Sequence, residues 1–183
     1  MLLIILLFVG AYSAIGIKIK LQATTNTNEV YTPGLGYEPN GYIALNYDND
    51  GWAYVYFSHS LEMERLGYTW KIGSQQGVAA ISDYGFNVFN VNLRYQKFSL
   101  YSGPFIGYVF QRENQSKDQI FNHNNVIAGE DIVEGYDIGL AWKFKLEHEL
   151  GVEYSLRHTS WIEDYAFGRT FVGIGVYYKY SFK

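Results

Sequence analysis

Two side chains near the C-terminal end of the chain could do chemistry together. In the segment 152–160, His158 and Ser160 are two residues apart on an expected β-strand, so both project to the same side. An imidazole beside a hydroxyl forms half of a nucleophile-and-base pair, because the imidazole can take the hydroxyl proton. The nearest downstream carboxylates are Glu163 and Asp164, which fall in the loop expected at 161–169. The pattern predicts a candidate catalytic pair, His158 and Ser160.

Metal and cofactor chemistry has no comparable signal. The chain contains no cysteine, and its four histidines do not have the spacing of metal ligands. We therefore expect no metal and no cofactor. The net charge of −4 comes without any basic patch, which argues against binding to nucleic acid.

Strands with two different faces must position the candidate pair. In the last strand, Val172, Ile174 and Val176 alternate with Gly173 and Gly175, so one face is apolar and the other small or polar. The same alternation recurs along the chain and predicts about eight strands. It is found in nine segments: 15–23, 42–48, 52–60, 66–72, 89–95, 98–111, 136–144, 150–156 and 171–182. The segments 24–39 and 73–86 are the hardest to assign.

Connections of unequal length join these strands. Short turns are expected at 48–51, 96–97 and 145–148, and a long polar loop at 112–131. Short turns on one side and long loops on the other are typical of transmembrane β-barrels. The sequence predicts an all-β fold, a single antiparallel up-and-down β-barrel that crosses a membrane. A soluble barrel or sandwich, with its apolar face turned inward, is the competing fold.

If the chain forms a transmembrane barrel, its charged residues fall into two groups, those inside the barrel and those in loops. Those on the polar faces of strands are expected to point into the barrel, where opposite charges brace the interior: Lys18, Lys20, Arg94, Lys143, Glu153 and Arg157. The carboxylates in 62–65 and 131–134 are expected in solvated loops.

The N-terminus predicts export. Residues 2–9 form an uncharged apolar run, too short to cross a bilayer as a helix, followed by small residues at 10–14. We expect a signal peptide over 1–14 and one barrel domain over 15–183. Cleavage is expected at the pattern Ala11-x-Ser13, or at Ala14-x-Gly16.

The chain resembles two groups of proteins. Its strand pattern and aromatic last strand resemble small outer-membrane β-barrels and their terminal assembly signal, although Lys183 follows Phe182. Its size, export signal and the segment 154–160 resemble the outer-membrane lipid A 3-O-deacylases. That second resemblance implies an acyl-ester hydrolase with Ser160 as nucleophile, His158 as base and an acid on the following strand. The corresponding stretch here, 169–173, holds no carboxylate.

The leading expectation is a non-enzymatic barrel in the bacterial outer membrane, with a structural or surface-interaction role carried by its outer loops. A lipid A hydrolase and a soluble, lipocalin-like binder are the alternatives. The resemblance implies lipid and lipopolysaccharide as surroundings and the barrel-assembly machinery as a partner during biogenesis; the ligand of the loops stays open.

Overall fold

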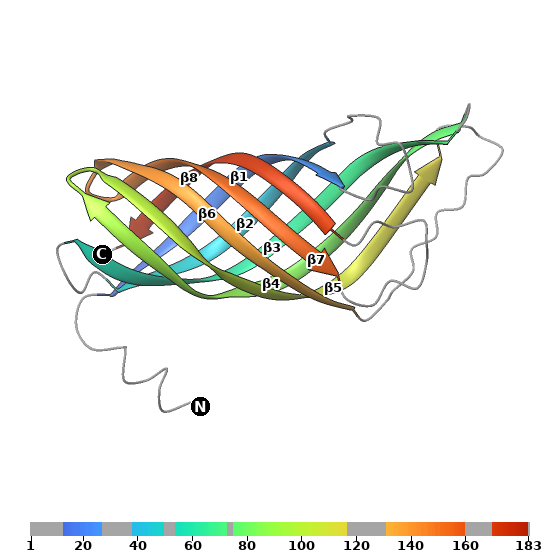
Figure 1. Ribbon diagram of the computed structural model, residues 1–183. Coiled ribbons are helices and arrows are strands. Elements are labelled where there is room, and N and C mark those ends of the chain that lie inside the picture. The colour runs from blue at the N-terminus through green and yellow to red at the C-terminus, as the bar shows by residue number, and fades with distance from the viewer. Residues whose placement is uncertain are drawn as a thin grey trace.

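Eight antiparallel strands close into one barrel in the computed structural model of the chain (Figure 1). The structure describes residues 13–26, 38–49, 54–72, 75–116, 131–159 and 170–182. The strands are β1 (Ser13–Asn26), β2 (Glu38–Asn49), β3 (Val55–Ile72), β4 (Gln75–Tyr95), β5 (Phe98–Ser116), β6 (Asp131–Lys145), β7 (His148–Thr159) and β8 (Thr170–Phe182). Each strand pairs with the next along the chain, and β1 pairs with β8 to close the sheet. The expected up-and-down barrel of about eight strands is confirmed.

The barrel has its apolar face outside. Along β7, Val152, Tyr154 and Leu156 are exposed, whereas the alternate residues Glu153 and Arg157 are buried in the interior. The same arrangement holds on β1, where Ile19 and Leu21 are exposed and Lys20 is fully buried. Water would penalise such a surface, whereas a hydrocarbon layer matches it. The soluble alternative required the reverse orientation and is therefore wrong.

Histidines mark the two ends of this apolar belt on β7. His148 begins the strand, and His158 follows the last apolar outward residue, Leu156. The 11 residues from His148 to His158 match the roughly 9–11 residues with which a tilted strand crosses a bilayer. No helix in the described part of the chain is long and apolar enough to span a bilayer.

Three strands continue past the belt at the loop end. The ladder between β2 and β3 ends at Glu64, and the ladder between β5 and β6 ends at Val109. Beyond these positions β3, β4 and β5 remain paired with one another, out to the pairs Ile72–Gln75 and Gly77–Ser116. Figure 1 shows these strands projecting beyond the others at one end of the barrel.

Several expected boundaries are corrected by these long strands. The segments expected at 52–60 and 66–72 are parts of one strand, β3, which begins at Val55, and most of 73–86 belongs to β4. The expected loop at 112–131 is shorter, because β5 runs to Ser116 and β6 begins at Asp131. Residues 117–130 lie outside the described residues.

The short turns are nearly as expected. Gln96 and Lys97 link β4 to β5, with Gln96 at a φ of 55°, and Leu146 and Glu147 link β6 to β7. Of the turn expected at 48–51, Asp48 and Asn49 belong to β2, and residues 50–53 lie outside the described residues. β1 already begins at Ser13, inside the segment expected as a signal peptide; residues 1–12 lie outside the described residues, and the signal peptide stays a prediction.

Candidate functional site

His158 lies on the outward face of β7, as its parity with Val152 and Leu156 predicts. Its Nδ1 atom is 3.0 Å from Oγ1 of Thr170, the cross-strand neighbour on β8. Thr170 thus occupies the place on the following strand where a hydrolase of the resembled family would need an acid. A neutral hydroxyl cannot balance the positive charge of an imidazolium as a carboxylate does.

The other expected members of a catalytic group fall elsewhere. Ser160, Glu163 and Asp164 lie outside the described residues, so the pairing of His158 with Ser160 stays a prediction. One described acid, Glu134 on β6, is the cross-strand neighbour of His158. No hydrogen bond or ion pair joins Glu134 to His158, whose Nδ1 faces the opposite neighbour.

Glu134 was expected in a solvated loop at 131–134, and the structure contradicts that expectation. It lies on the outward face of β6, two residues before the exposed Tyr136. Its parity with Tyr136, Ile138 and Leu140 is the sequence signal that could have placed it there.

A second group of polar residues fills the interior around Arg157. Its guanidinium is fully buried and meets three carboxylates, with Nε 2.5 Å from Glu64, Nη1 2.8 Å from Asp137 and Nη2 3.5 Å from Glu62. Phe105 stacks against it, with its ring centroid 3.8 Å from Cζ. We call Arg157, Glu62, Glu64 and Asp137 the arginine hub.

The hub corrects the expectation for residues 62–65. Glu62 and Glu64 were expected in a solvated loop, but they lie on β3 and point into the barrel, each almost completely buried. They alternate with the exposed Leu61 and Met63, so their parity carried the signal. Their partner is remote in sequence, 93 residues from Glu64, and no local pattern reveals it.

Glu153 forms a neighbouring cluster nearer the short turns. It accepts hydrogen bonds from Lys18, from Lys20 at 2.6 Å and from the hydroxyl of Tyr101. Lys20 also donates to Ser155 at 2.9 Å, and the ammonium of Lys18 lies 4.4 Å from the ring centroid of Tyr177. The expected inward brace is confirmed for Lys18, Lys20, Glu153 and Arg157, while Arg94 and Lys143 are only half-buried.

An apolar cluster closes the interior on the loop side of the hub. Six inward residues form it: Leu66, Ile81, Phe105, Val109, Val133 and Phe171. Each has at most 3% of its surface exposed, so the interior is packed there as a protein core.

Carboxylates slightly outnumber cations in this interior. The described buried residues include Glu62, Glu64, Asp83, Asp137 and Glu153 against Lys18, Lys20, Arg157 and Lys179. Asp83 is fully buried, and neither of its carboxyl oxygens has a hydrogen-bond partner among the residues that the structure describes. The described residues contain no group of three or more His, Asp or Glu side chains that could hold a metal ion.

Comparison with known proteins supports the fold. No family model and no curated protein sequence match the chain. Several solved structures are similar to the chain. One is Ail, the attachment invasion locus protein of Yersinia pestis, which has 14% identity over 93% of this chain and 97% of that chain (TM-score 0.54). Neisserial surface protein A has 9% identity with the same coverage (TM-score 0.53). The outer-membrane enzyme PagL has 11% identity over 90% of this chain and 98% of that one (TM-score 0.50). The chain thus has the fold of small bacterial outer-membrane barrels.

Replacing the central cation tests the arginine hub. Arg157→Leu leaves buried carboxylates without their partner, and we expect a loss of about 3–5 kcal/mol in the free energy of unfolding. Urea unfolding in lipid vesicles, followed by tryptophan fluorescence, measures the change.

The control is Arg157→Leu combined with Glu64→Gln and Asp137→Asn. Because the neutral amides need no counter-charge, this variant should recover a large part of the lost stability. Equal stability of the two variants would show that Arg157 acts through packing alone.

Proposed function

We propose that this chain is an outer-membrane barrel with a structural or surface-interaction role, carried by the side that holds the longer connections. The packed interior is the observation that carries this proposal. The arginine hub and the apolar cluster fill the barrel with buried side chains, so the lumen is not suited to carry solutes. Function is then left to the surfaces that face lipid and the cell exterior.

The projection of β3, β4 and β5 favours an interaction at the loop side. These strands remain paired beyond the apolar belt, which supplies a rigid base for the connection between β5 and β6. Three paired strands can hold their shape where two would be marginal, so this extension can carry a binding segment away from the membrane. We infer that the segment 117–130 makes the contact with the partner.

A sulfated polysaccharide is not the ligand that we propose. Ail has been crystallised with the heparin analogue sucrose octasulfate. In the present chain the segment 117–130 has one Lys, one Asp and one Glu, and the whole chain has a net charge of −4. That charge does not attract a polyanion, so a polar or neutral surface is the better match.

We propose that lipopolysaccharide surrounds the barrel at its loop end. On the outward faces of three neighbouring strands, Glu134, His158 and Thr170 replace the apolar residues of the belt. Polar side chains in this position meet headgroups as the strands leave the hydrocarbon. The barrel-assembly machinery is the partner that we propose during biogenesis.

Shortening one connection tests the surface role. Bacterial cells expressing the chain should adhere to one another or to epithelial cells, and replacing residues 117–130 by a short Gly-Ser turn should abolish the gain. Heat-modifiable migration on gels verifies that the shortened barrel is folded. Adherence that survives in the shortened, folded variant would contradict this role for the segment.

A lipid A acyl-ester hydrolase is the second candidate function. The observation that favours it is the position of His158, exposed on the lipid-facing side at the rim, with an acid on the adjacent strand. The contact of its Nδ1 with Thr170 weighs against it.

Mass spectrometry of lipid A distinguishes the two functions. We expect the same acyl pattern in cells expressing the wild-type chain, the Ser160→Ala variant and no chain. If the wild-type chain alone removes an acyl group, Ser160 is the nucleophile and the hydrolase is the correct function.

A further inference from the structure

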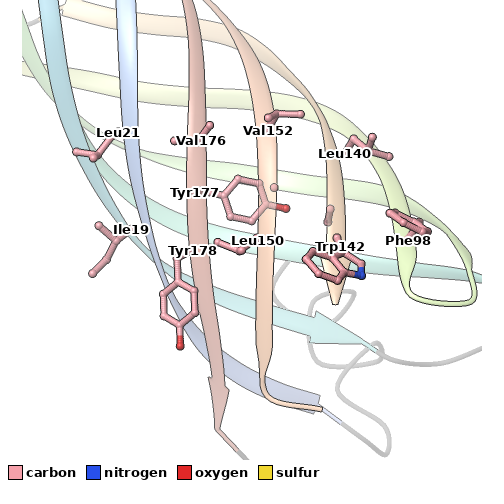
Figure 2. Close-up of a pocket in the computed structure, with 12 residues that line it drawn as sticks. Ile19, Leu21, Phe98, Leu140, Trp142, Leu150, Val152, Val176, Tyr177 and Tyr178 are labelled. Atoms are coloured by element: carbon pink, nitrogen blue, oxygen red, sulfur yellow. The ribbon is translucent and has the colours of Figure 1, made fainter. Parts of the chain in front are cut away.

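A groove crosses the lipid-facing side of the barrel near the short turns (Figure 2). It has a volume of about 590 Å³ and extends from β1 over β8, β7 and β6 to the start of β5. One wall is an aliphatic row, Leu21, Val176, Val152 and Leu140, whose members are cross-strand neighbours. The facing wall contains three aromatic side chains, Tyr178, Trp142 and Phe98, together with Ile19 and Leu150.

The floor of the groove is backbone. Ala141 and Tyr177 lie between the two rows and are buried, since their side chains point into the barrel. No described residue fills the space above them on the outer side, so the two rows of outward side chains form the walls of the groove. The result is a shallow, open apolar groove on a surface that already faces hydrocarbon.

The groove runs obliquely through the belt. At one end Phe98 is the first residue of β5 and adjoins the turn at Gln96 and Lys97. At the other end Leu21 lies deep within β1, which begins at Ser13 on the same side of the barrel. A molecule lying along the groove therefore has one end at the membrane surface and the other in the hydrocarbon interior, as a lipid acyl chain does.

Cationic groups stand at the surface end. Lys97 and Lys145 are both exposed, and neither makes an ion pair with a described residue. The backbone N–H of Lys143 donates to the carbonyl of Lys97 at 2.7 Å, which holds the two turn regions side by side. An anionic group at this end of the groove would be attracted to both lysines.

The aromatic wall is already held in place. The hydroxyl of Tyr178 is 2.6 Å from Nδ1 of His148, and Trp142 packs against Phe144 with ring centroids 5.6 Å apart. A ligand would therefore lose little free energy in ordering these side chains.

We propose that this groove binds one acyl chain of an anionic phospholipid, with Lys97 and Lys145 holding its phosphate at the turn side of the membrane. In barrels of this type the short turns are periplasmic, so the lipid belongs to the periplasmic leaflet. The site is separate from the outer rim at His158, and it requires only that the belt faces a bilayer.

Quenching of Trp142 by brominated lipid tests the site. The protein carries Trp52→Phe, Trp70→Phe and Trp161→Phe, so that Trp142 is the one fluorophore of its kind. It is reconstituted in phosphatidylcholine brominated on its acyl chains, into which unbrominated phosphatidylglycerol or phosphatidylcholine is mixed. Phosphatidylglycerol should relieve the quenching at a lower proportion, with a preference of about fivefold for each lysine.

Three further variants locate the preference. Lys97→Gln with Lys145→Gln should remove it, and Val176→Phe, which fills the centre of the groove, should weaken it. The matched control combines Trp142→Phe with Leu61→Trp, so that the tryptophan lies away from the groove. Leu61 is an outward residue of β3 and is 56% exposed. For the tryptophan at position 61 we expect phosphatidylglycerol and phosphatidylcholine to relieve the quenching equally.

Three outcomes would overturn the proposal. Equal relief of quenching by the two lipids at Trp142 would mean that no anionic lipid is selected. An equal preference at the Leu61→Trp position would mean a general attraction of the barrel for anionic lipid. Quenching that falls as the protein-to-lipid ratio rises would mean that a second copy of the chain occupies the groove.

Discussion

The need to satisfy every polar group without water governs this structure. In hydrocarbon an unpaired backbone N–H or C=O costs several kcal/mol, so strands can cross only as a closed sheet. The pairing of β1 with β8 provides that closure. Charged side chains face the same constraint, and Lys18, Lys20 and Arg157 point inward and meet carboxylates there.

The arginine hub is where this constraint is concentrated. A single guanidinium joins carboxylates from β3 and β6 to its own strand, β7, and so links strands from opposite parts of the sheet. Because these contacts cross the lumen, they hold the barrel together from within as the backbone ladders do around its circumference. They also occupy the space that a pore would need, which is why the proposed function lies on the surfaces.

Alternation along single strands was enough to predict much of the fold. The alternation in β1 and β7 placed Lys18, Lys20 and Glu153 inside and His158 outside. It could do so because the residues facing lipid are apolar and those facing the interior are small or polar within each single strand. Glu62 and Glu64 were wrongly predicted to lie in a solvated loop, because two carboxylates so close in sequence usually indicate a segment exposed to water. The cation that balances them, Arg157, lies more than 90 residues later in the sequence. The neighbours of His158 could not be predicted either, since the register with Glu134 and Thr170 depends on connections whose lengths the sequence does not define.

The orientation of the two faces is the central claim, and spin labels test it most directly. The chain has no cysteine, so single cysteines at Val152, Tyr154, Leu156 and Ile174 can each carry a nitroxide in a reconstituted bilayer. These positions should collide more often with oxygen, which concentrates in hydrocarbon, than with a water-soluble nickel complex. A label at Lys97 should show the reverse. Preferential collision of the four outward labels with the nickel complex would contradict a barrel whose apolar face lies in lipid.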